Sequence, residues 1–324
     1  MKTPTLRHLC SASSGSVFCV LAASLLAVTG CDAEFDPGSQ VNSLRVLAVQ
    51  ADSPYAAPGE TVRLQALSFD PLGRPITWAW ALCPNPSSSS VEACLLNVIE
   101  TAASTGSAPL LGTGVGMNEL ELTIPENALD AIAPSARPQA LLGVLSVACP
   151  GTLDLNAQPS DASPLPIRCS DAAGNELGLH DTIVGVKRIF LRQTDRNANP
   201  IIERITFDGE DWPADEIKEV DSCDTDEFAY DDCKGDPRHD ISAVLSPESF
   251  ETGTDEFGRT YSEELIVQHF TTDGIFEFEV RVAADPVTGW VSRKSAAGSE
   301  IPLWFVARDD RGGVTYAERT VRVR

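Results

Sequence analysis

The chain has 324 residues, of which 47 are acidic and 24 are basic, and its formal net charge is -23 at pH 7. A charge of this sign repels phosphate backbones and excludes nucleic acid as a partner. Aromatic residues are scarce, whereas Gly and Pro number 23 and 22. This composition favours short strands joined by turns, and the length favours two domains.

The first 30 residues have the organisation of an export signal. Lys2 and Arg7 precede an apolar segment at residues 17–29, and the small residue Gly30 follows it. A bilayer-spanning helix needs about 20 apolar residues, so this segment is too short to span. It is predicted to be a removed signal peptide and not a membrane helix.

The four residues that end this signal are VTGC, with Cys31 last. They resemble the lipobox of bacterial lipoproteins. The resemblance implies transfer of diacylglycerol to the Cys31 sulfur, cleavage after Gly30 and acylation of the new amino terminus. Several acyl chains anchor a protein stably without a transmembrane helix. We expect attachment to a membrane through this lipid, at the outer membrane or cell surface rather than at the periplasmic face of the inner membrane, although Asp32 resembles the inner-membrane retention signal of enteric lipoproteins.

The cysteine count is consistent with a special role for Cys31. Of nine cysteines, two lie in the signal, and setting Cys31 aside leaves an even number, as an exported disulfide protein should have. Fifteen pairings of six cysteines are formally open. The spacing favours three local pairs: Cys83 with Cys94, Cys149 with Cys169, and Cys223 with Cys233. The alternative, in which Cys31 is itself a free or disulfide-bonded thiol, leaves an odd number.

Alternating strand patterns begin after a short polar tether. The sequence PGETVRLQALSFDPLG at residues 58–73 reads as a strand and its turn, and ITWAW at residues 76–80 reads as the next strand. These two stretches resemble the front half of immunoglobulin-like and PKD-type domains of bacterial surface proteins. The chain departs from antibody domains because Cys83 follows the tryptophans, so the resemblance does not imply their disulfide between the sheets.

Two interpretations of the tryptophans stay open. Period two places Trp78 and Trp80 on the same face of their strand. Either they pack in the core of the sandwich, or they form an exposed aromatic platform for a sugar, with Trp290 as a further candidate.

The rest of the first domain has less regular patterns. Residues 84–116 are rich in Ser, Ala, Thr and Gly, and PENALDAIA at residues 125–133 is expected to form one or two helical turns. Two strands, at residues 139–149 and 181–193, are expected to close the domain around a polar insert. The linker that follows contains Asp195, Asn197 and Asn199, which faintly resemble the calcium-binding linker of cadherins.

The second domain ends in its clearest pattern. Residues 301–324 comprise a buried type of strand, the turn DDRGG and a final strand, and they resemble the last two strands of PKD and other immunoglobulin-like domains. The predicted fold is therefore all-β, with two tandem immunoglobulin-like sandwiches. The expected organisation is a signal peptide at 1–30, a tether at 31–41, the first sandwich at 42–193, a linker at 194–200 and the second sandwich at 201–324.

An acidic loop surrounds the third cysteine pair. A disulfide-closed loop could hold several carboxylates for a calcium ion, which prefers oxygen ligands. The spacing does not match the EF-hand, so a solvated acidic loop is the alternative. The candidate ligands are Asp221, Asp224, Asp226, Asp231 and Asp232.

Motifs for catalysis are missing from the sequence. GxSxG, HExxH and P-loop patterns do not occur, and His239 beside Asp240 is interpreted as a surface pair. We therefore expect no enzyme and no cofactor other than calcium. The expected role is structural, adhesive or protein-interacting at the cell envelope, with envelope proteins or glycans as partners. A carbohydrate- or peptide-binding module is the first alternative, and an envelope hydrolase, whose two carboxylates would leave no motif, is the second.

Overall fold

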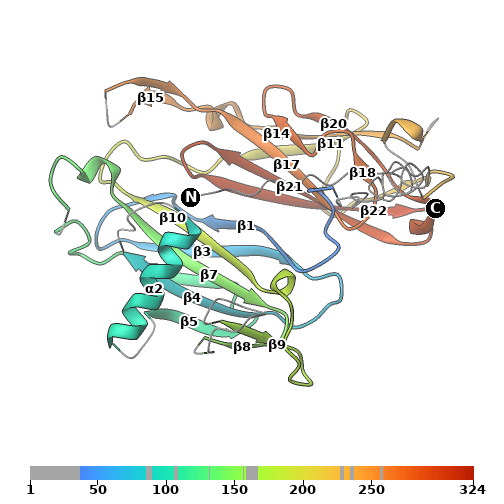
Figure 1. Ribbon diagram of the computed structural model, residues 1–324. Coiled ribbons are helices and arrows are strands. Elements are labelled where there is room, and N and C mark those ends of the chain that lie inside the picture. The colour runs from blue at the N-terminus through green and yellow to red at the C-terminus, as the bar shows by residue number, and fades with distance from the viewer. Residues whose placement is uncertain are drawn as a thin grey trace, which may run out of the picture. The chain divides into compact units, whose positions relative to one another are not determined.

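The described part of the chain is built mainly from β-sheets, and its four larger sheets pack in two pairs (Figure 1). The computed structural model describes residues 37–84, 90–105, 109–130, 132–155, 157, 167–226, 230–233, 237–255 and 258–324. The export signal, the lipobox and Cys31 lie outside the described residues. Within the described residues, no helix is long and apolar enough to cross a bilayer.

The first sandwich packs a three-stranded sheet, in the order β1-β3-β6, against a five-stranded sheet, in the order β2-β10-β7-β4-β5. A separate two-stranded ribbon, β8-β9, extends from it. The strands are β1 (Arg45–Ala51), β2 (Tyr55–Ala56), β3 (Thr61–Phe69), β4 (Thr77–Pro84), β5 (Leu110–Val115), β6 (Glu119–Thr123), β7 (Leu141–Cys149), β8 (Thr152–Asp154), β9 (Arg168–Ser170) and β10 (Ile183–Leu191).

The second sandwich packs a sheet in the order β12-β11-β14-β20-β18 against one in the order β13-β22-β21-β17-β19, and the ribbon β15-β16 extends from it. The strands are β11 (Ile202–Phe207), β12 (Glu210–Asp211), β13 (Ile217–Val220), β14 (His239–Leu245), β15 (Thr252–Thr254), β16 (Thr260–Ser262), β17 (Leu265–Thr271), β18 (Ile275–Phe276), β19 (Val280–Val282), β20 (Val287–Val291), β21 (Glu300–Asp309) and β22 (Val314–Val323).

Each sandwich contains a five-stranded sheet of the same topology, β2-β10-β7-β4-β5 in the first and β13-β22-β21-β17-β19 in the second. In each, a short early strand pairs in parallel with the last strand, β2 with β10 and β13 with β22, while the other pairings are antiparallel. The last strand also pairs antiparallel with β7 in the first sandwich and with β21 in the second, as strands F and G pair in immunoglobulin domains. The prediction of two tandem immunoglobulin-like sandwiches is confirmed.

Each sandwich has its own apolar core, and the tryptophans lie inside these cores. Trp78 and Trp80 are exposed by 1% and 0%, and their rings stack with centroids 5.6 Å apart. Trp290 is fully buried in the second core. The interpretation of Trp78, Trp80 and Trp290 as an exposed platform is therefore wrong, because the inward side of each strand carries the ring between the two sheets.

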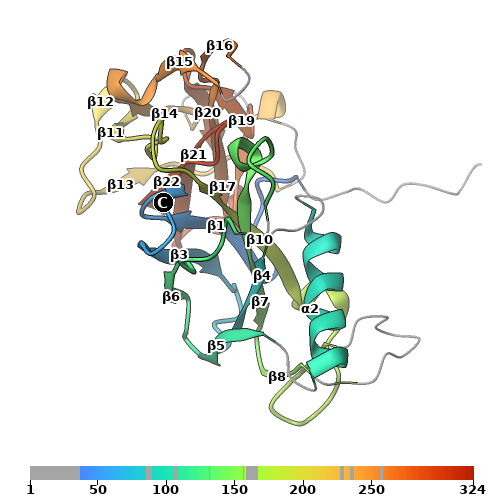
Figure 2. The same cartoon turned by 90° about the vertical axis from the view of Figure 1, so that its left-hand side faces the viewer.

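One helix, α2 (Val91–Thr105), was not expected from the sequence. Its buried residues Cys94, Leu95 and Val98 pack on the outward side of β4 and β7, where Ala79 and Leu145 lie. Figure 2 shows α2 lying along this sheet. The helix therefore covers a sheet face that would otherwise meet solvent.

Three disulfides join the cysteines in the local pairs that the spacing favours. They are Cys83–Cys94, Cys149–Cys169 and Cys223–Cys233. The first ties α2 to β4, and the second ties β7 to β9.

Short turns complete the fold. Residues 125–133, expected as one or two helical turns, form successive hydrogen-bonded turns where they are described: the Ala128 N–H donates to the Pro125 carbonyl, and the Asp130 N–H donates to the Asn127 carbonyl. The 3-10 turns are η1 (Arg137–Gln139), η2 (Leu179–Asp181), η3 (Tyr230–Asp232), η4 (Pro247–Ser249) and η5 (Lys294–Ala296).

Candidate functional site at the junction of the sandwiches

Residues 38–324 form one compact unit, so the two sandwiches meet at a packed junction. A bulge in β1 builds part of it. The register of β1 against β3 shifts between Val46 and Ala48, so that Leu47 and Ala48 both turn away from the first core. Both are 3% exposed and lie in a third apolar cluster with Trp304 and Val306 of β21.

Trp304 is the largest side chain in this junction cluster. It lies on the side of β21 opposite the second core and packs against Phe69 of β3, with ring centroids 4.9 Å apart. Its Nε1 donates to a carboxylate oxygen of Glu318 at 2.9 Å, so the buried indole N–H is satisfied. The two sandwiches therefore share an apolar contact with the composition of a core.

The chain enters the first sandwich by way of the second. Ser39 and Val41 exchange backbone hydrogen bonds with Thr271 of β17, at 2.9 and 2.8 Å, and Val41 is fully buried. Ser39, Gln40 and Val41 were expected to belong to a polar tether. Their burial means that the chain leaves the second sandwich at Gly38.

The linker between the sandwiches is fixed by side-chain amides. Asn199 Nδ2 donates to the Ala51 carbonyl at 2.6 Å, and Asn199 Oδ1 accepts from the Val314 N–H at 2.9 Å. Asn197 Nδ2 donates to Asp309 at 2.9 Å. The amides therefore bind protein groups on both sandwiches, and the geometry gives no support to the cadherin-like calcium interpretation of Asp195, Asn197 and Asn199.

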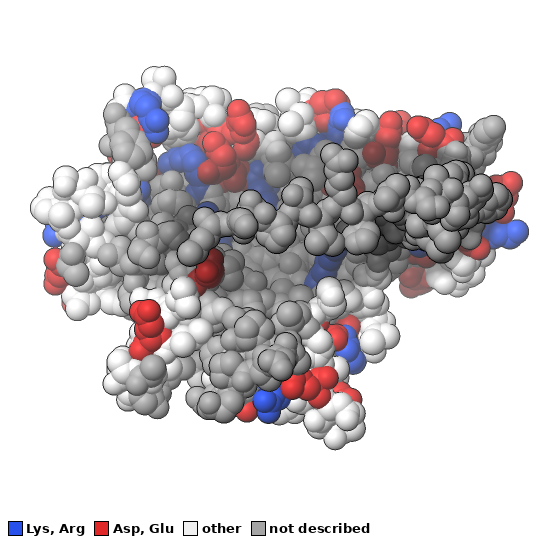
Figure 3. Space-filling view, viewed as in Figure 1, with Lys and Arg blue, Asp and Glu red and all other residues white. Residues whose placement is uncertain are grey.

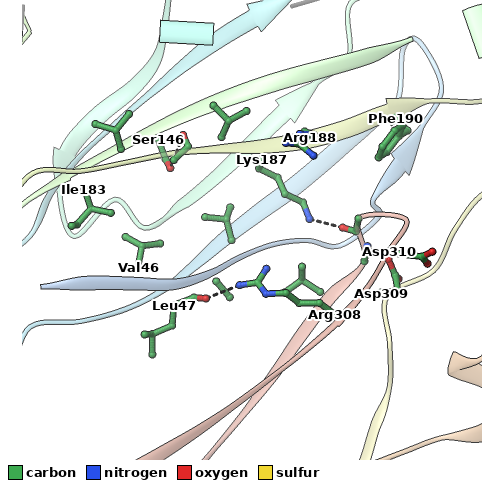
Figure 4. Close-up of a pocket in the computed structure, with 18 residues that line it drawn as sticks. Val46, Leu47, Ser146, Ile183, Lys187, Arg188, Phe190, Arg308, Asp309 and Asp310 are labelled. Atoms are coloured by element: carbon green, nitrogen blue, oxygen red, sulfur yellow. Dashed lines mark hydrogen bonds between the residues drawn. The ribbon is translucent and has the colours of Figure 1, made fainter. Parts of the chain in front are cut away.

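A cavity of about 450 Å³ opens where β1, β10 and the β21–β22 turn meet, and Figure 4 shows its lining. Lys187 extends from β10 into this region, and its Nζ donates to the Gly312 carbonyl at 2.8 Å. The residue is 7% exposed. Burial, together with repulsion from Arg308, lowers the pKa of Lys187 to about 8, and Asp309 opposes the shift.

Arg308 reaches the same cavity from the second sandwich (Figure 4). Its guanidinium donates to the Leu47 carbonyl at 2.7 Å and to the Gln268 side-chain oxygen at 2.7 Å. Burial lowers the pKa of Arg308 from its usual range. The bulged residue Leu47 thus contributes its side chain to the junction cluster and its carbonyl to Arg308.

The strand period could have revealed both cations. Ile183, Lys187 and Ile189 lie on one side of β10, and the isoleucines face the first core. Arg308 follows Trp304 and Val306 on one side of β21. A cation at a strand position where the period predicts an apolar side chain marks a candidate site. The sequence contained this signal, and it was missed.

A different ion network lies beside the cavity. Arg311 of the β21–β22 turn pairs with Glu263 at 3.2 Å and with Glu251 at 3.4 Å, and its guanidinium lies 5.2 Å from the Tyr55 ring of the first sandwich. Burial, with Asp309 and Glu251 nearby, raises the pKa of Glu263 to about 7. This network therefore also links the sandwiches.

The acidic loop does not gather its described carboxylates. Asp221 pairs with Arg324 at 3.2 Å, and Asp226 accepts from the Ser295 N–H at 2.6 Å, a bond that lowers the pKa of Asp226. The side chain of Asp232 lies outside the described residues, and among those described no three His, Cys, Asp or Glu side chains form a group that could hold a metal. On the face seen in Figure 3, acidic residues are scattered and interspersed with Lys and Arg.

The topology and the junction define the chain as a tandem immunoglobulin-like β-sandwich protein. No protein-family model matches its sequence, and a search of curated proteins found no match. Among solved structures, three N-terminal domains of the outer capsid protein Hoc of bacteriophage RB49 are 9% identical, with 87% of this chain and 59% of that chain covered and a TM-score of 0.21.

Two further matches are bacterial adhesins. A structure from a 1.5-MDa ice-binding adhesin is 9% identical over 87% of this chain and 65% of that chain, with a TM-score of 0.23. The adhesin InvE of Yersinia pseudotuberculosis is 8% identical over 85% and 58%, with a TM-score of 0.19. This chain spans less than two thirds of all three structures, and at such TM-scores the likeness carries no argument about function.

Proposed function

We propose that this chain is exported, held at the bacterial cell envelope by lipid on Cys31, and used there as a rigid structural or adhesive module without catalysis. The lipobox-like sequence supports the anchor, and three disulfides support an oxidising compartment. The expected location remains the outer membrane or the cell surface.

The observation that carries this proposal is the apolar junction around Trp304. Domains of one chain usually move relative to each other unless their interface is large and apolar. Here the interface buries Leu47, Val306 and Trp304, and polar contacts of the linker flank it. A stiff module of this kind can hold a binding surface at a fixed distance from a membrane.

The carboxylate pair most suggestive of hydrolysis supports a structural role instead. Glu251 and Glu263 lie close together, and the pKa of Glu263 is raised, which is typical of catalytic acids. However, Arg311 pairs with both carboxylates. A neighbouring cavity of about 440 Å³ is lined by residues that include Tyr55 and Arg311, but neither of the two carboxylates lines it. We therefore assign the pair to the junction and not to a reaction.

Metabolic labelling with palmitate tests the anchor. Wild-type chain should incorporate label and sediment with membranes, whereas Cys31→Ala should incorporate none and should appear in the soluble fraction. Ser39→Ala, a substitution beyond the lipobox, is the control and should label normally. Unlabelled wild-type chain would overturn the proposed anchor, and protease treatment of intact cells then distinguishes the cell surface from the periplasm.

A further inference from the structure

The cavity between β1, β10 and the β21–β22 turn combines an apolar wall with a cationic end. Val46, Val49 and Ile183 line it and are half-buried, and all three also contact the first core. Lys187 and Arg308 lie toward the β21–β22 turn (Figure 4). A volume of about 450 Å³ is within the range of small-molecule sites.

The two cations have few anionic partners. Lys187 Nζ has three N–H donors, yet its only hydrogen bond within the described chain is to a neutral carbonyl, that of Gly312. Among the residues that the structure describes, Arg308 also donates to neutral oxygens alone. The nearby Asp309 carboxylate accepts instead from Asn197 and from the Arg311 and Gly313 N–H groups.

Two half-buried arginines of this chain have carboxylate partners. Arg311 pairs with two carboxylates, and Arg74 pairs with both Asp70 and Asp181 at 2.8 Å. A chain with a net charge of -23 has many acids to place beside a cation. Asp309 and Asp310 also line the cavity, and Asp309 attracts Lys187, but within the described chain neither Lys187 nor Arg308 forms an ion pair with a carboxylate. Because a buried charge without a paired counter-charge is costly, this lack of an ion pair points to an anion from outside the chain.

We propose that this cavity binds a small organic anion, with its carboxylate or phosphate head between Lys187 and Arg308 and its apolar body against Val46, Val49 and Ile183. Charge-assisted hydrogen bonds from an ammonium and a guanidinium would hold the head. The ligand would contact β1 and β10 of the first sandwich and β21 of the second. Its binding therefore stabilises the junction as well as the fold.

Calorimetric titration of the full mature chain in a non-ionic detergent tests this assignment. The probes are hexanoate, hexanamide as its neutral counterpart, and inorganic phosphate. Hexanoate should bind and raise the midpoint of thermal unfolding, and hexanamide should bind at least about tenfold more weakly. Binding of phosphate in place of hexanoate would identify phosphate as the preferred head.

Two variants test the cationic end of the site and its apolar wall separately. Lys187→Met should weaken binding of either anion about tenfold or more, whereas the matched Lys218→Met, at a cation of β13 outside the cavity, should leave it unchanged. Gly185→Leu keeps Lys187 but fills the cavity, since an added Cβ there meets only Ser146 Oγ, at 3.4 Å, and it should abolish hexanoate binding.

Circular dichroism and the unfolding midpoint establish that each variant is folded. Three results would overturn the assignment. They are wild-type chain that binds neither hexanoate nor phosphate up to about 10 mM, hexanamide that binds as well as hexanoate, and folded Lys187→Met that binds the anion as wild type does.

Discussion

At the scale of single residues, two polar side chains lie at strand positions that face a core, where apolar side chains are expected. Lys187 and His269 both occupy such positions, in β10 and β17. His269 is 1% exposed, its Nδ1 donates to the Glu279 carbonyl at 3.2 Å, and its ring lies 5.3 Å from that of Phe276. Burial lowers the pKa of His269 to about 4, so the ring is neutral at physiological pH.

His269 should make the fold sensitive to acid. Its pKa falls from 6.5 to about 4 on folding, so between these values the unfolded chain binds more protons, and stability falls as the pH falls through this window. At about 1.4 kcal/mol per pKa unit, the loss is on the order of 3 kcal/mol. Urea unfolding at pH 7 and pH 4 measures it, and His269→Gln should remove this part of the pH dependence. An equal pH dependence in the variant would show that His269 is not responsible.

At the scale of elements, apolar packing holds the helix α2 against the first sandwich. Leu95 is 8% exposed and faces the sheet, whereas its neighbour Leu96 is 50% exposed. The two leucines therefore differ only in the side of the helix on which they lie.

Leu95→Ala should lower the free energy of unfolding by about 2–4 kcal/mol, because it removes buried methylene groups and leaves a cavity. Leu96→Ala, which deletes the same atoms from an exposed position, should change it by less than about 0.5 kcal/mol. Chemical denaturation of both variants makes the comparison. Equal losses would mean that α2 does not pack on the sheet as described.

The sequence predicted the positions of the strands better than it predicted which elements pack against them. Strand patterns in the sequence identified β3, β4, β7, β10 and the β21–β22 hairpin, and the alternation is clearest in β3, where Val62, Leu64 and Ala66 face the first core. The apolar spacing of Cys94, Leu95 and Val98 marks a helix, but it lies in a Ser- and Ala-rich stretch and was missed. An alternating pattern also does not reveal what packs on the side of a strand that faces away from its own core. The burial of Leu47 and Trp304 on that side could therefore not be predicted.

The site was less predictable than the fold for the same reason. The disulfide pairs follow from short spacings, and the two strand-borne cations were visible as exceptions to an apolar face. Their meeting in one cavity depends on the bulge at Leu47 and on the approach of the β21–β22 turn, which are contacts between distant parts of the chain.

At the scale of the whole molecule, the junction makes two sandwiches into one body. The Ser39–Val41 segment, the linker amides, the Trp304 cluster and the Arg311 network all join residues of different sandwiches or secure the chain between them. The two sandwiches should therefore move together as a unit.

The distance between spin labels on the two sandwiches tests this claim most directly. Labels at Val115→Cys in β5 and Val282→Cys in β19, positions that are 69% and 57% exposed, can be introduced in a Cys31→Ser background. Double electron–electron resonance should give a single narrow distance distribution, and Trp304→Ala together with Asn199→Ala should broaden it. A broad distribution in the otherwise unaltered chain would show two sandwiches that move independently and would contradict the rigid junction.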